Sequence, residues 1–380
     1  MAESENTQVI LLLKAHFSRR RDGDAAPLPP GQYATFADWL EEKGWMPQDL
    51  LHSRDEILTA WQDEKGEKDK KDPKNKIDRD RLAALLDRGV ALGMALEKWA
   101  SAGIWILTTL DESYPQPFRD LLGSTLPPVL FGVGDARLLN KGGLAMVGSR
   151  SITPADERYT EFVARSATGE GWSVISGGAR GVDELSVQTA LSCEGTAVAI
   201  LADGLLKAAL SSKWRRPLQR RELCLASPFA PEASFQVGNA MARNKYVYAI
   251  ADYAVVVRSE QEKGGTWAGA TEALKKRLAP VFVNPDAKAE GNAALLELGA
   301  LPLPLPGEDV DSASPWLSEA VEAGKAGDSD DRVFPMSTAD SASESALESA
   351  LEPALESTPE DSPEPKAAPK PKSPKQQKLF

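Results

Sequence analysis

The chain of 380 residues is poor in the side chains from which disulfide frameworks, metal centres and acid–base sites are usually built. Its two cysteines, Cys193 and Cys224, offer neither a disulfide framework nor a metal-ligand spacing, which suits a reducing cytoplasm. Its two histidines, His16 and His52, lie in the N-terminal region, so no Ser–His or Cys–His pair is expected beside the glycine-rich motifs described below. We therefore expect no metal, no cofactor and no catalytic chemistry.

Long hydrophobic runs are also missing from the sequence. No apolar stretch approaches the roughly 20 residues that a helix needs to span a bilayer. The first six residues are acidic rather than basic, and the apolar run from Val9 to Leu13 is too short for the core of a signal peptide. These features predict a cytoplasmic protein with no membrane-bound part.

The net charge of −12 is unevenly distributed along the chain. Residues 311–365 carry 14 acidic and 2 basic side chains, and residues 366–380 carry 5 lysines and no acid. The first 310 residues therefore hold only about −5, and they include a basic cluster between Lys207 and Arg221. Because the acidity belongs mainly to the C-terminal part, it does not exclude a nucleic acid as the partner of the rest of the chain.

Composition divides the chain into three parts. Residues 1–105 are expected to form a small helical domain packed around tryptophans such as Trp39, Trp61 and Trp99. Residues 106–305, which include a connector at 106–140, alternate short apolar runs with helical patterns, as in a parallel sheet covered by helices on both faces. Residues 306–380 are rich in Ser, Ala, Glu, Asp and Pro, which predicts a disordered tail.

Three glycine-rich turns follow predicted strands of the middle part: Val147–Arg150, Ser176–Asp183 and Lys263–Thr266. A tight turn between a strand and a helix points bare backbone N–H groups and the positive helix end at a phosphate, and a basic side chain adds a charged donor. We therefore predict a Rossmann-like, doubly wound and mostly parallel sheet whose carboxyl edge forms one phosphate-binding crevice. Its expected residues are Gly148, Ser149, Arg150, Ser176, Gly177, Gly178, Arg180, Lys263, Gly264, Gly265 and Thr266.

The order of these motifs resembles the DNA-processing protein A (DprA/Smf) family, within the Rossmann-like superfamily shared with cytokinin-activating LOG proteins. The resemblance runs from about Ile104 to Pro285. Besides the three turns it includes Tyr114-Pro115, Pro127–Phe131 and Arg243-Asn244. It implies single-stranded DNA binding, formation of a homodimer and delivery of the DNA to a RecA-type recombinase.

The resemblance also implies roles for individual residues. Arg150 and the backbone around Gly177 and Gly178 would hold a DNA phosphate, Arg243 would contact phosphate, and Asn244 would hold its loop together. Asp183 is expected to cap a helix or to pair with an arginine.

The sequence departs from the family pattern at three places. Val187 stands where a histidine is common, Lys213–Arg216 replaces the usual Tyr-Pro after Gly204, and no winged-helix domain follows the α/β part. The departures point to a divergent member of the family.

Two other functions stay open. Gly264-Gly265-Thr266 with Glu272 loosely resembles the Gly-Gly-x-Gly-Thr-x-x-Glu motif of LOG proteins, so the chain would be a sensor of a nucleotide or a hydrolase that cleaves the glycosidic bond of a nucleoside monophosphate. In the hydrolase, Arg150 or Arg180 would grip the phosphate. Alternatively, the protein is an adaptor whose α/β domain is structural and whose tail carries the function.

The last five residues, Gln376–Phe380, resemble the short peptide by which bacterial proteins dock on the DNA sliding clamp. Gln376 would fix the orientation, and Leu379 and Phe380 would enter an apolar pocket of the clamp. The sequence therefore predicts a second, partner-binding element at the end of the tail.

Overall fold

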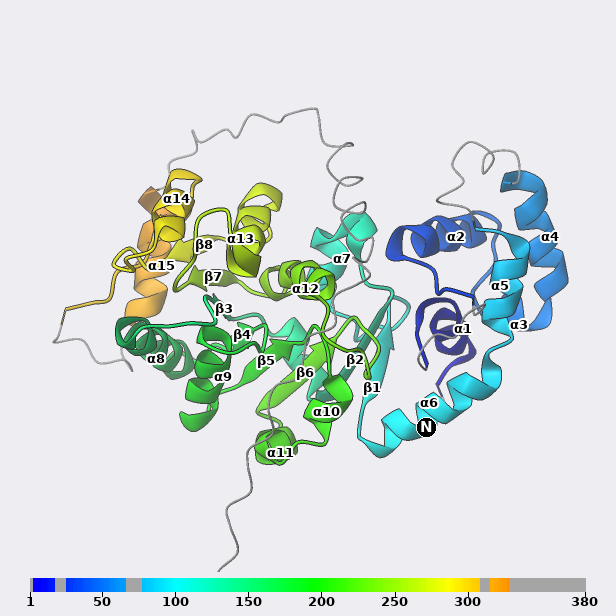
Figure 1. The fold of residues 1–380 in the computed structure, drawn as a ribbon, viewed down its shortest axis with the longest axis horizontal. Coiled ribbons are helices and arrows are strands. Elements are labelled where there is room, and N and C mark those ends of the chain that lie inside the picture. Colours follow the sequence, from blue (N-terminus) through cyan, green and yellow to red (C-terminus); the bar gives the residue numbers. More distant parts are fainter. Residues whose placement is uncertain (1–2, 18–24, 66–76, 308–314, 328–380) are drawn as a thin grey trace, which may run out of the picture. The chain divides into compact units, whose positions relative to one another are not determined.

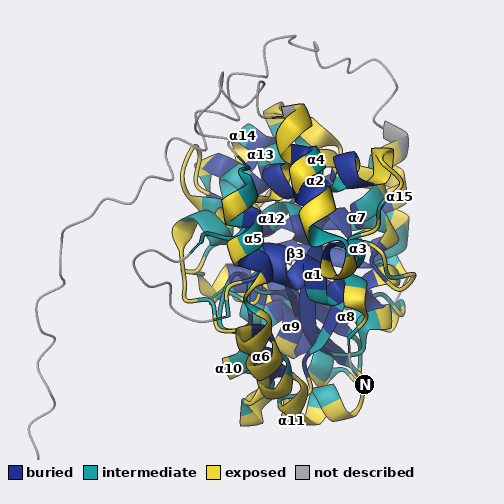
Figure 2. Cartoon of the chain, turned by 90° about the vertical axis from the view of Figure 1, so that its right-hand side faces the viewer, coloured by how far each residue is buried: buried dark blue, intermediate teal, exposed yellow. Residues whose placement is uncertain are grey.

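The computed structural model describes residues 3–17, 25–65, 77–307 and 315–327 (Figure 1). Its N-terminal region contains the helices α1 (Glu5–Lys14), α2 (Pro30–Glu42), α3 (Asp49–His52), α4 (Arg54–Lys65), α5 (Arg79–Leu86) and α6 (Gly89–Ser101). Helix α1 is buried from Val9 to Leu13, whereas α4 and α6 each expose one side (Figure 2). The apolar run at 9–13 is therefore the centre of a helical core.

Tryptophans supply much of that core. Trp39 and Trp61 are almost fully buried, and their ring centres lie 5.0 Å apart with the planes at 77°. Trp99 is also buried and packs edge-on against Phe131 of the sheet, with the ring centres 5.1 Å apart. The prediction that these tryptophans are core residues is confirmed.

One sheet of nine strands forms the centre of the rest of the described chain. The strands are β1 (Trp105–Thr108), β2 (Val129–Gly134), β3 (Leu144–Val147), β4 (Val174–Ser176), β5 (Ala197–Ile200), β6 (Leu223–Ser227), β7 (Tyr253–Val256), β8 (Val281–Val283) and β9 (Leu301–Pro302). Their order is β1-β2-β6-β5-β4-β3-β7-β8-β9, and β2 pairs antiparallel with both β1 and β6 while all other pairs are parallel. The predicted Rossmann-like, mostly parallel sheet is confirmed.

Helices cover both faces of the sheet. They are α7 (Gln116–Leu121), α8 (Pro154–Gly169), α9 (Val182–Ser192), α10 (Leu205–Ala209), α11 (Ser212–Gln219), α12 (Val237–Ala249), α13 (Gly264–Lys276), α14 (Glu290–Glu297) and α15 (Trp316–Gly327). Two short 3-10 turns, Gly123–Thr125 and Ala136–Asn140, complete the connector. Ala145 and Val147 of β3 share a core with α12 and α13, whereas Leu144 and Met146 share one with α8 and α9. This alternation follows from the two-residue period of a strand buried on both faces.

Local signals fixed several boundaries. Helix α8 begins with a capping box, followed by Pro154: the Thr153 hydroxyl accepts the Asp156 N–H, and the Asp156 carboxylate accepts the Thr153 N–H. Strand β3 is the apolar run directly before the first glycine-rich turn, and β1 begins at Trp105, the last residue of the range 1–105.

The expected start of the disordered tail at residue 306 is wrong, because residues 316–327 form helix α15 on the α/β part. Leu317 and Val321 of this helix are fully buried beside Phe282 and Leu303. The backbone N–H groups of Leu317 and Ser318 donate to the Glu170 carboxylate at 2.8 and 2.9 Å. The prediction failed because it rested on average composition, which does not register a short apolar stripe with helical spacing. The remainder of the predicted tail, with Gln376, Leu379 and Phe380, lies outside the described residues.

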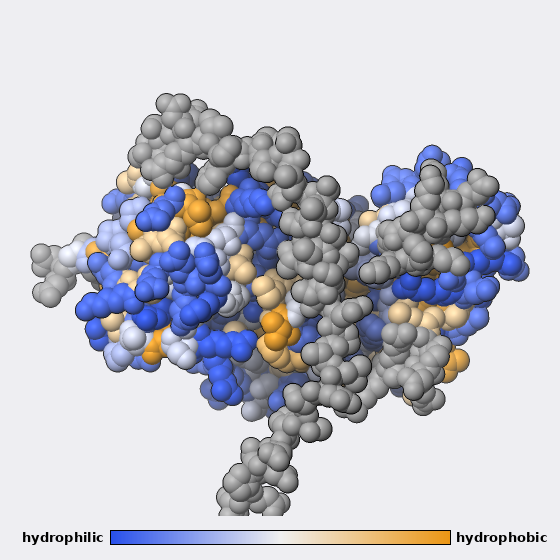
Figure 3. Space-filling model, turned by 45° about the horizontal axis from the view of Figure 1, so that its top comes forward, coloured by the Kyte–Doolittle hydropathy of each residue, from blue (hydrophilic) through white to orange (hydrophobic). Residues whose placement is uncertain are grey.

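The exterior of the described part is mainly polar. On the face in Figure 3, hydrophilic side chains dominate and the apolar ones form small, separate patches. None of the helices in the described ranges is long and apolar enough to cross a membrane.

Candidate phosphate-binding crevice

A cavity of about 790 Å³ opens beyond the carboxyl ends of β4 and β5. Its charged lining residues are the cations Arg150, Arg180, Lys207, Lys213 and Arg243 and the acids Glu184 and Asp203. Lys213 forms an ion pair with Glu184. The other lining cations outnumber the one remaining acid, Asp203, so the cavity keeps an excess of positive charge. We refer to this cavity as the crevice.

The first glycine-rich turn brings Arg150 to the crevice. Gly148 allows the turn to lie against helix α9, because a Cβ there would be 2.4 Å from Cγ2 of Val182. The Ser149 N–H donates to the Arg258 carbonyl at 3.0 Å, and the Ser149 hydroxyl accepts from the Ser151 N–H at 3.1 Å. Ser149 thus fixes the turn, and the backbone hydrogen bond of its own N–H makes that group unavailable to a ligand.

The second turn forms the floor of the crevice. The Ser176 hydroxyl donates to the Met146 carbonyl at 2.6 Å, which ties β4 to β3. Gly178 adopts a φ of +68°, a conformation that favours glycine. Gly177 has no room for a side chain, because a Cβ there would lie 1.4 Å from Nη1 of Arg243. The bare backbone of this turn and the Arg243 guanidinium therefore face the same space.

Arg243 is 6 % exposed and lies on α12. Its Nη1 is 3.9 Å from Oδ2 of Asp183, which is equally buried and accepts the Ala179 N–H at 3.4 Å. Burial lowers the pKa of Arg243, with Asp183 opposing that effect, and burial raises the pKa of Asp183, with Arg243 opposing it. The Nε of Arg243 has no hydrogen-bond partner. Asp183 therefore has the expected role of partner to an arginine, and Arg243 lines the crevice as a largely buried cation.

The rim of the crevice carries aromatic side chains. The Arg150 guanidinium lies 5.4 Å from the ring centre of Phe235, and the Lys213 ammonium lies 4.3 Å from that of Trp214. Phe235 is 49 % exposed and was not among the predicted site residues. Its only signal in the sequence is an aromatic residue in a polar loop before a predicted helix. Trp214 belongs to the Lys213–Arg216 segment that departs from the family pattern.

The third turn does not line the crevice, so the expectation that all three turns would line one crevice holds for two of them. The Thr266 hydroxyl donates to the Gly148 carbonyl at 3.0 Å, and the Asn244 amide donates to the Gly265 carbonyl at 2.8 Å. Asn244 thus holds its loop together, as expected. The third turn braces the first turn, and binding of an anion by Lys263 or Gly264 stays a prediction.

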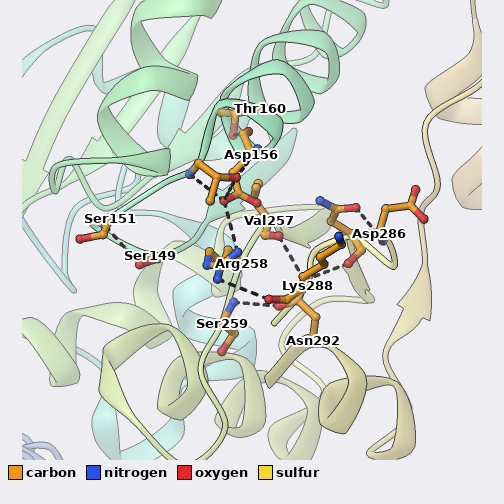
Figure 4. Close-up of polar contacts among 12 residues, drawn as sticks. Ser149, Ser151, Asp156, Thr160, Val257, Arg258, Ser259, Asp286, Lys288 and Asn292 are labelled. Atoms are coloured by element: carbon orange, nitrogen blue, oxygen red, sulfur yellow. Dashed lines mark hydrogen bonds and ion pairs between the residues drawn. The ribbon is translucent and has the colours of Figure 1, made fainter. Parts of the chain in front are cut away.

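Protein side chains form polar contacts with one another beside the position where the strand order reverses, between β3 and β7 (Figure 4). Arg258 lies 3.5 Å from Oδ2 of Asp156, and the Asn292 side chain bonds the Ser259 N–H at 2.7 Å and the Val257 carbonyl at 3.1 Å. Open parallel sheets usually bind ligands at this reversal. In this structure the crevice lies instead beyond β4 and β5.

The structure gives no support to a hydrolase built on Glu272. This residue lies on α13, pairs with Lys276 at 2.9 Å and does not line the crevice. Within the described ranges, no group of three or more His, Cys, Asp and Glu side chains could hold a metal ion.

Residues 105–310 match the family model described as DNA recombination-mediator protein A. The chain belongs to this family. The match covers the whole sheet and includes Arg150, Gly177 and Arg243. The family match and the crevice thus involve the same part of the chain.

Curated relatives include DNA processing protein DprA of Bacillus subtilis, 26% identical over 224 residues, and protein Smf of Escherichia coli, 27% identical over 222 residues. These alignments span 55% and 56% of this chain, and 71% and 58% of the relatives. The structure of DNA processing protein A from Streptococcus pneumoniae aligns with a TM-score of 0.60 at 18% identity, over 85% of this chain and 98% of that one. This member of the DNA recombination-mediator protein A family therefore shares that fold, helical region included.

Proposed function

We propose that the protein binds single-stranded DNA by holding a backbone phosphate in the crevice. The observation that carries the proposal is that Arg150, the largely buried Arg243 and the bare backbone of Gly177 and Gly178 line one crevice. Arginine guanidinium groups bind phosphate through charge-assisted hydrogen bonds, so this lining suits a phosphate. Family membership and the names of the curated relatives support DNA as the source of that phosphate.

A single strand suits the crevice better than a duplex. The phosphate has to enter a concavity, and the exposed ring of Phe235 and the partly buried ring of Trp214 at the rim offer stacking surfaces to unpaired bases. The excess cations, Arg150, Arg180 and Lys207, supply the salt-dependent attraction to neighbouring phosphates. Helix α11 adds two further basic side chains, Arg215 and Arg216, to those that line the crevice.

The competing function is binding of a mononucleotide, because a volume of about 790 Å³ is also typical of small-ligand sites. The two are separated by anisotropy titrations of a fluorescent single-stranded oligonucleotide at two salt concentrations, with duplex DNA and mononucleotides as competitors. We expect Arg150→Ala to weaken binding about tenfold or more. The slope of the logarithm of affinity against the logarithm of salt concentration should become shallower by the amount that corresponds to about one phosphate contact. Arg165→Ala removes the same charge from the exposed side of α8 and should change little.

Displacement of the oligonucleotide by a mononucleotide would favour the nucleotide sensor. Equal effects of the Arg150 and Arg165 substitutions would contradict the crevice as the binding site, because only Arg150 lines it.

We further propose, from the family resemblance, a non-catalytic role in the cytoplasm: the protein forms a homodimer and delivers single-stranded DNA to a RecA-type recombinase. Light scattering of the purified chain tests the dimer. A recombinase filament assay on DNA coated with single-strand-binding protein tests the delivery.

Deletion of Leu379 and Phe380 tests the sliding-clamp peptide, since clamp binding should disappear while oligonucleotide binding stays unchanged. Loss of cellular activity with intact DNA binding would favour the adaptor.

A further inference from the structure

A second cavity, of about 950 Å³, lies where the helical region meets the sheet. Its walls come from the end of α1, the start of α2, strand β2 and the segment after β6, and it shares no lining residue with the crevice. We refer to it as the junction cavity. Phe229 and Asn239 line the junction cavity, whereas Phe235 and Ala240 line the crevice, so residues 229–240 separate the two.

The buried part of the junction cavity is apolar. Its lining includes the buried side chains of Leu28, Pro127, Pro128, Phe131 and Tyr246. Proline and aromatic rings present rigid, flat surfaces, and rigid groups lose little conformational entropy when a ligand packs on them. Such a lining suits a ligand with a flat apolar body.

One charge in the junction cavity lacks an opposite partner. Lys14, the last residue of α1, donates a hydrogen bond from Nζ to the Leu28 carbonyl at 2.7 Å. None of the described carboxylates forms an ion pair with it, and burial lowers its pKa to about 7. The other cationic lysine, Lys98, pairs at 2.9 Å with Glu232, which also accepts the Trp99 indole N–H at 3.0 Å.

We propose that the junction cavity binds a small organic anion with a flat apolar body, whose anionic group pairs with the Lys14 amine. An ammonium group has three donors, and only one of them is used by the Leu28 carbonyl. A carboxylate or sulfonate beside Lys14 would use the others and would offset the unfavourable burial of the charge. This inference does not depend on DNA binding in the crevice.

The probe for this site is 8-anilinonaphthalene-1-sulfonate, compared with N-phenyl-1-naphthylamine, which has the same rings and no charge. Dye fluorescence is titrated with the full chain. We expect one site that prefers the sulfonate, and we expect Lys14→Met to weaken sulfonate binding about tenfold or more while the uncharged dye binds as well as before. Methionine keeps the length of the side chain, so the apolar packing survives.

A pH series adds a second readout. The preference for the sulfonate should fall as the pH rises above about 7, where the empty site loses the proton of Lys14. In the same pH series, Lys14→Met should show no such fall in the preference for the sulfonate. The remaining titratable groups that line the cavity, His16, Lys98, Glu232 and Tyr246, stay in both proteins, so the difference reports Lys14.

Two further variants locate the dye. Ala233→Trp places a large ring in the junction cavity and should block both dyes, whereas Arg150→Ala, in the crevice, should leave both unchanged. Sulfonate binding that survives Lys14→Met, or that Arg150→Ala abolishes, would overturn the proposal. Oligonucleotide binding measured on the same variants reports the crevice separately, so failure at one site does not imply failure at the other.

Discussion

Replacing Gly177 with alanine tests whether the Arg243 guanidinium lies against Gly177 in the crevice. The new Cβ would lie 1.4 Å from Nη1 and 2.2 Å from Cζ of Arg243, so the guanidinium has to leave. Gly177 is not among the glycines with positive φ, so its backbone conformation suits alanine and the clash is the only large effect expected.

The displaced guanidinium leaves the buried Asp183 carboxylate without its cation. Breaking a buried ion pair costs about 3–5 kcal/mol. At 3.9 Å this pair is long, so we expect a loss of about 2 kcal/mol in the free energy of unfolding and a fall of roughly 4–8 °C in Tm. Oligonucleotide binding should weaken as much as it does in Arg243→Ala, because both variants remove the same donor.

A double-mutant cycle gives the decisive comparison. In the Arg243→Ala background no guanidinium is present to clash, so adding Gly177→Ala should cost less than about 0.5 kcal/mol. Gly93→Ala is the matched control: nothing lies within 4 Å of its added Cβ in helix α6, and it should stabilise that helix by about 0.5–1 kcal/mol. Wild-type stability and DNA affinity in Gly177→Ala would refute the placement of Arg243.

Three further changes test other parts of the fold. Lys14→Met should raise the free energy of unfolding at pH 7 by on the order of 2 kcal/mol. Wild type should gain stability from pH 7 to about 10, because Lys14 binds fewer protons in the folded than in the unfolded state over that range, and the variant should lose this gain. An equal change in the free energy of unfolding between the two pH values for wild type and variant would contradict this. Leu317→Ala should cost about 2–4 kcal/mol in thermal unfolding because its side chain is fully buried, and a neutral result would mean that α15 is not docked. Thr153→Ala should cost about 1 kcal/mol through the lost helix cap, whereas Thr153→Ser should cost little.

Short-range patterns in the sequence predicted many of the elements. Strand β3 and the start of helix α8 follow local signals, because an apolar run of four residues followed by glycine, and a threonine cap followed by a proline, are decided by neighbours along the chain. The two turns that line the crevice were identified in the same way. Helix α15 was missed because its apolar stripe is short and lies in a segment whose average composition is that of disorder.

Only the tertiary structure decided which of these elements meet. The strand order places the turns after β3 and β4 side by side, while an ion pair between Arg258 and Asp156 joins the segments that follow β7 and β3. It also pairs Arg243 with Asp183, 60 residues away in the chain, and places the Arg243 guanidinium against position 177, which leaves room only for glycine. Residues far apart in sequence meet only through the packing of the whole sheet and its helices, and no local rule contains that information. The sequence determined the chemistry of the parts, and the fold determined which parts form the site.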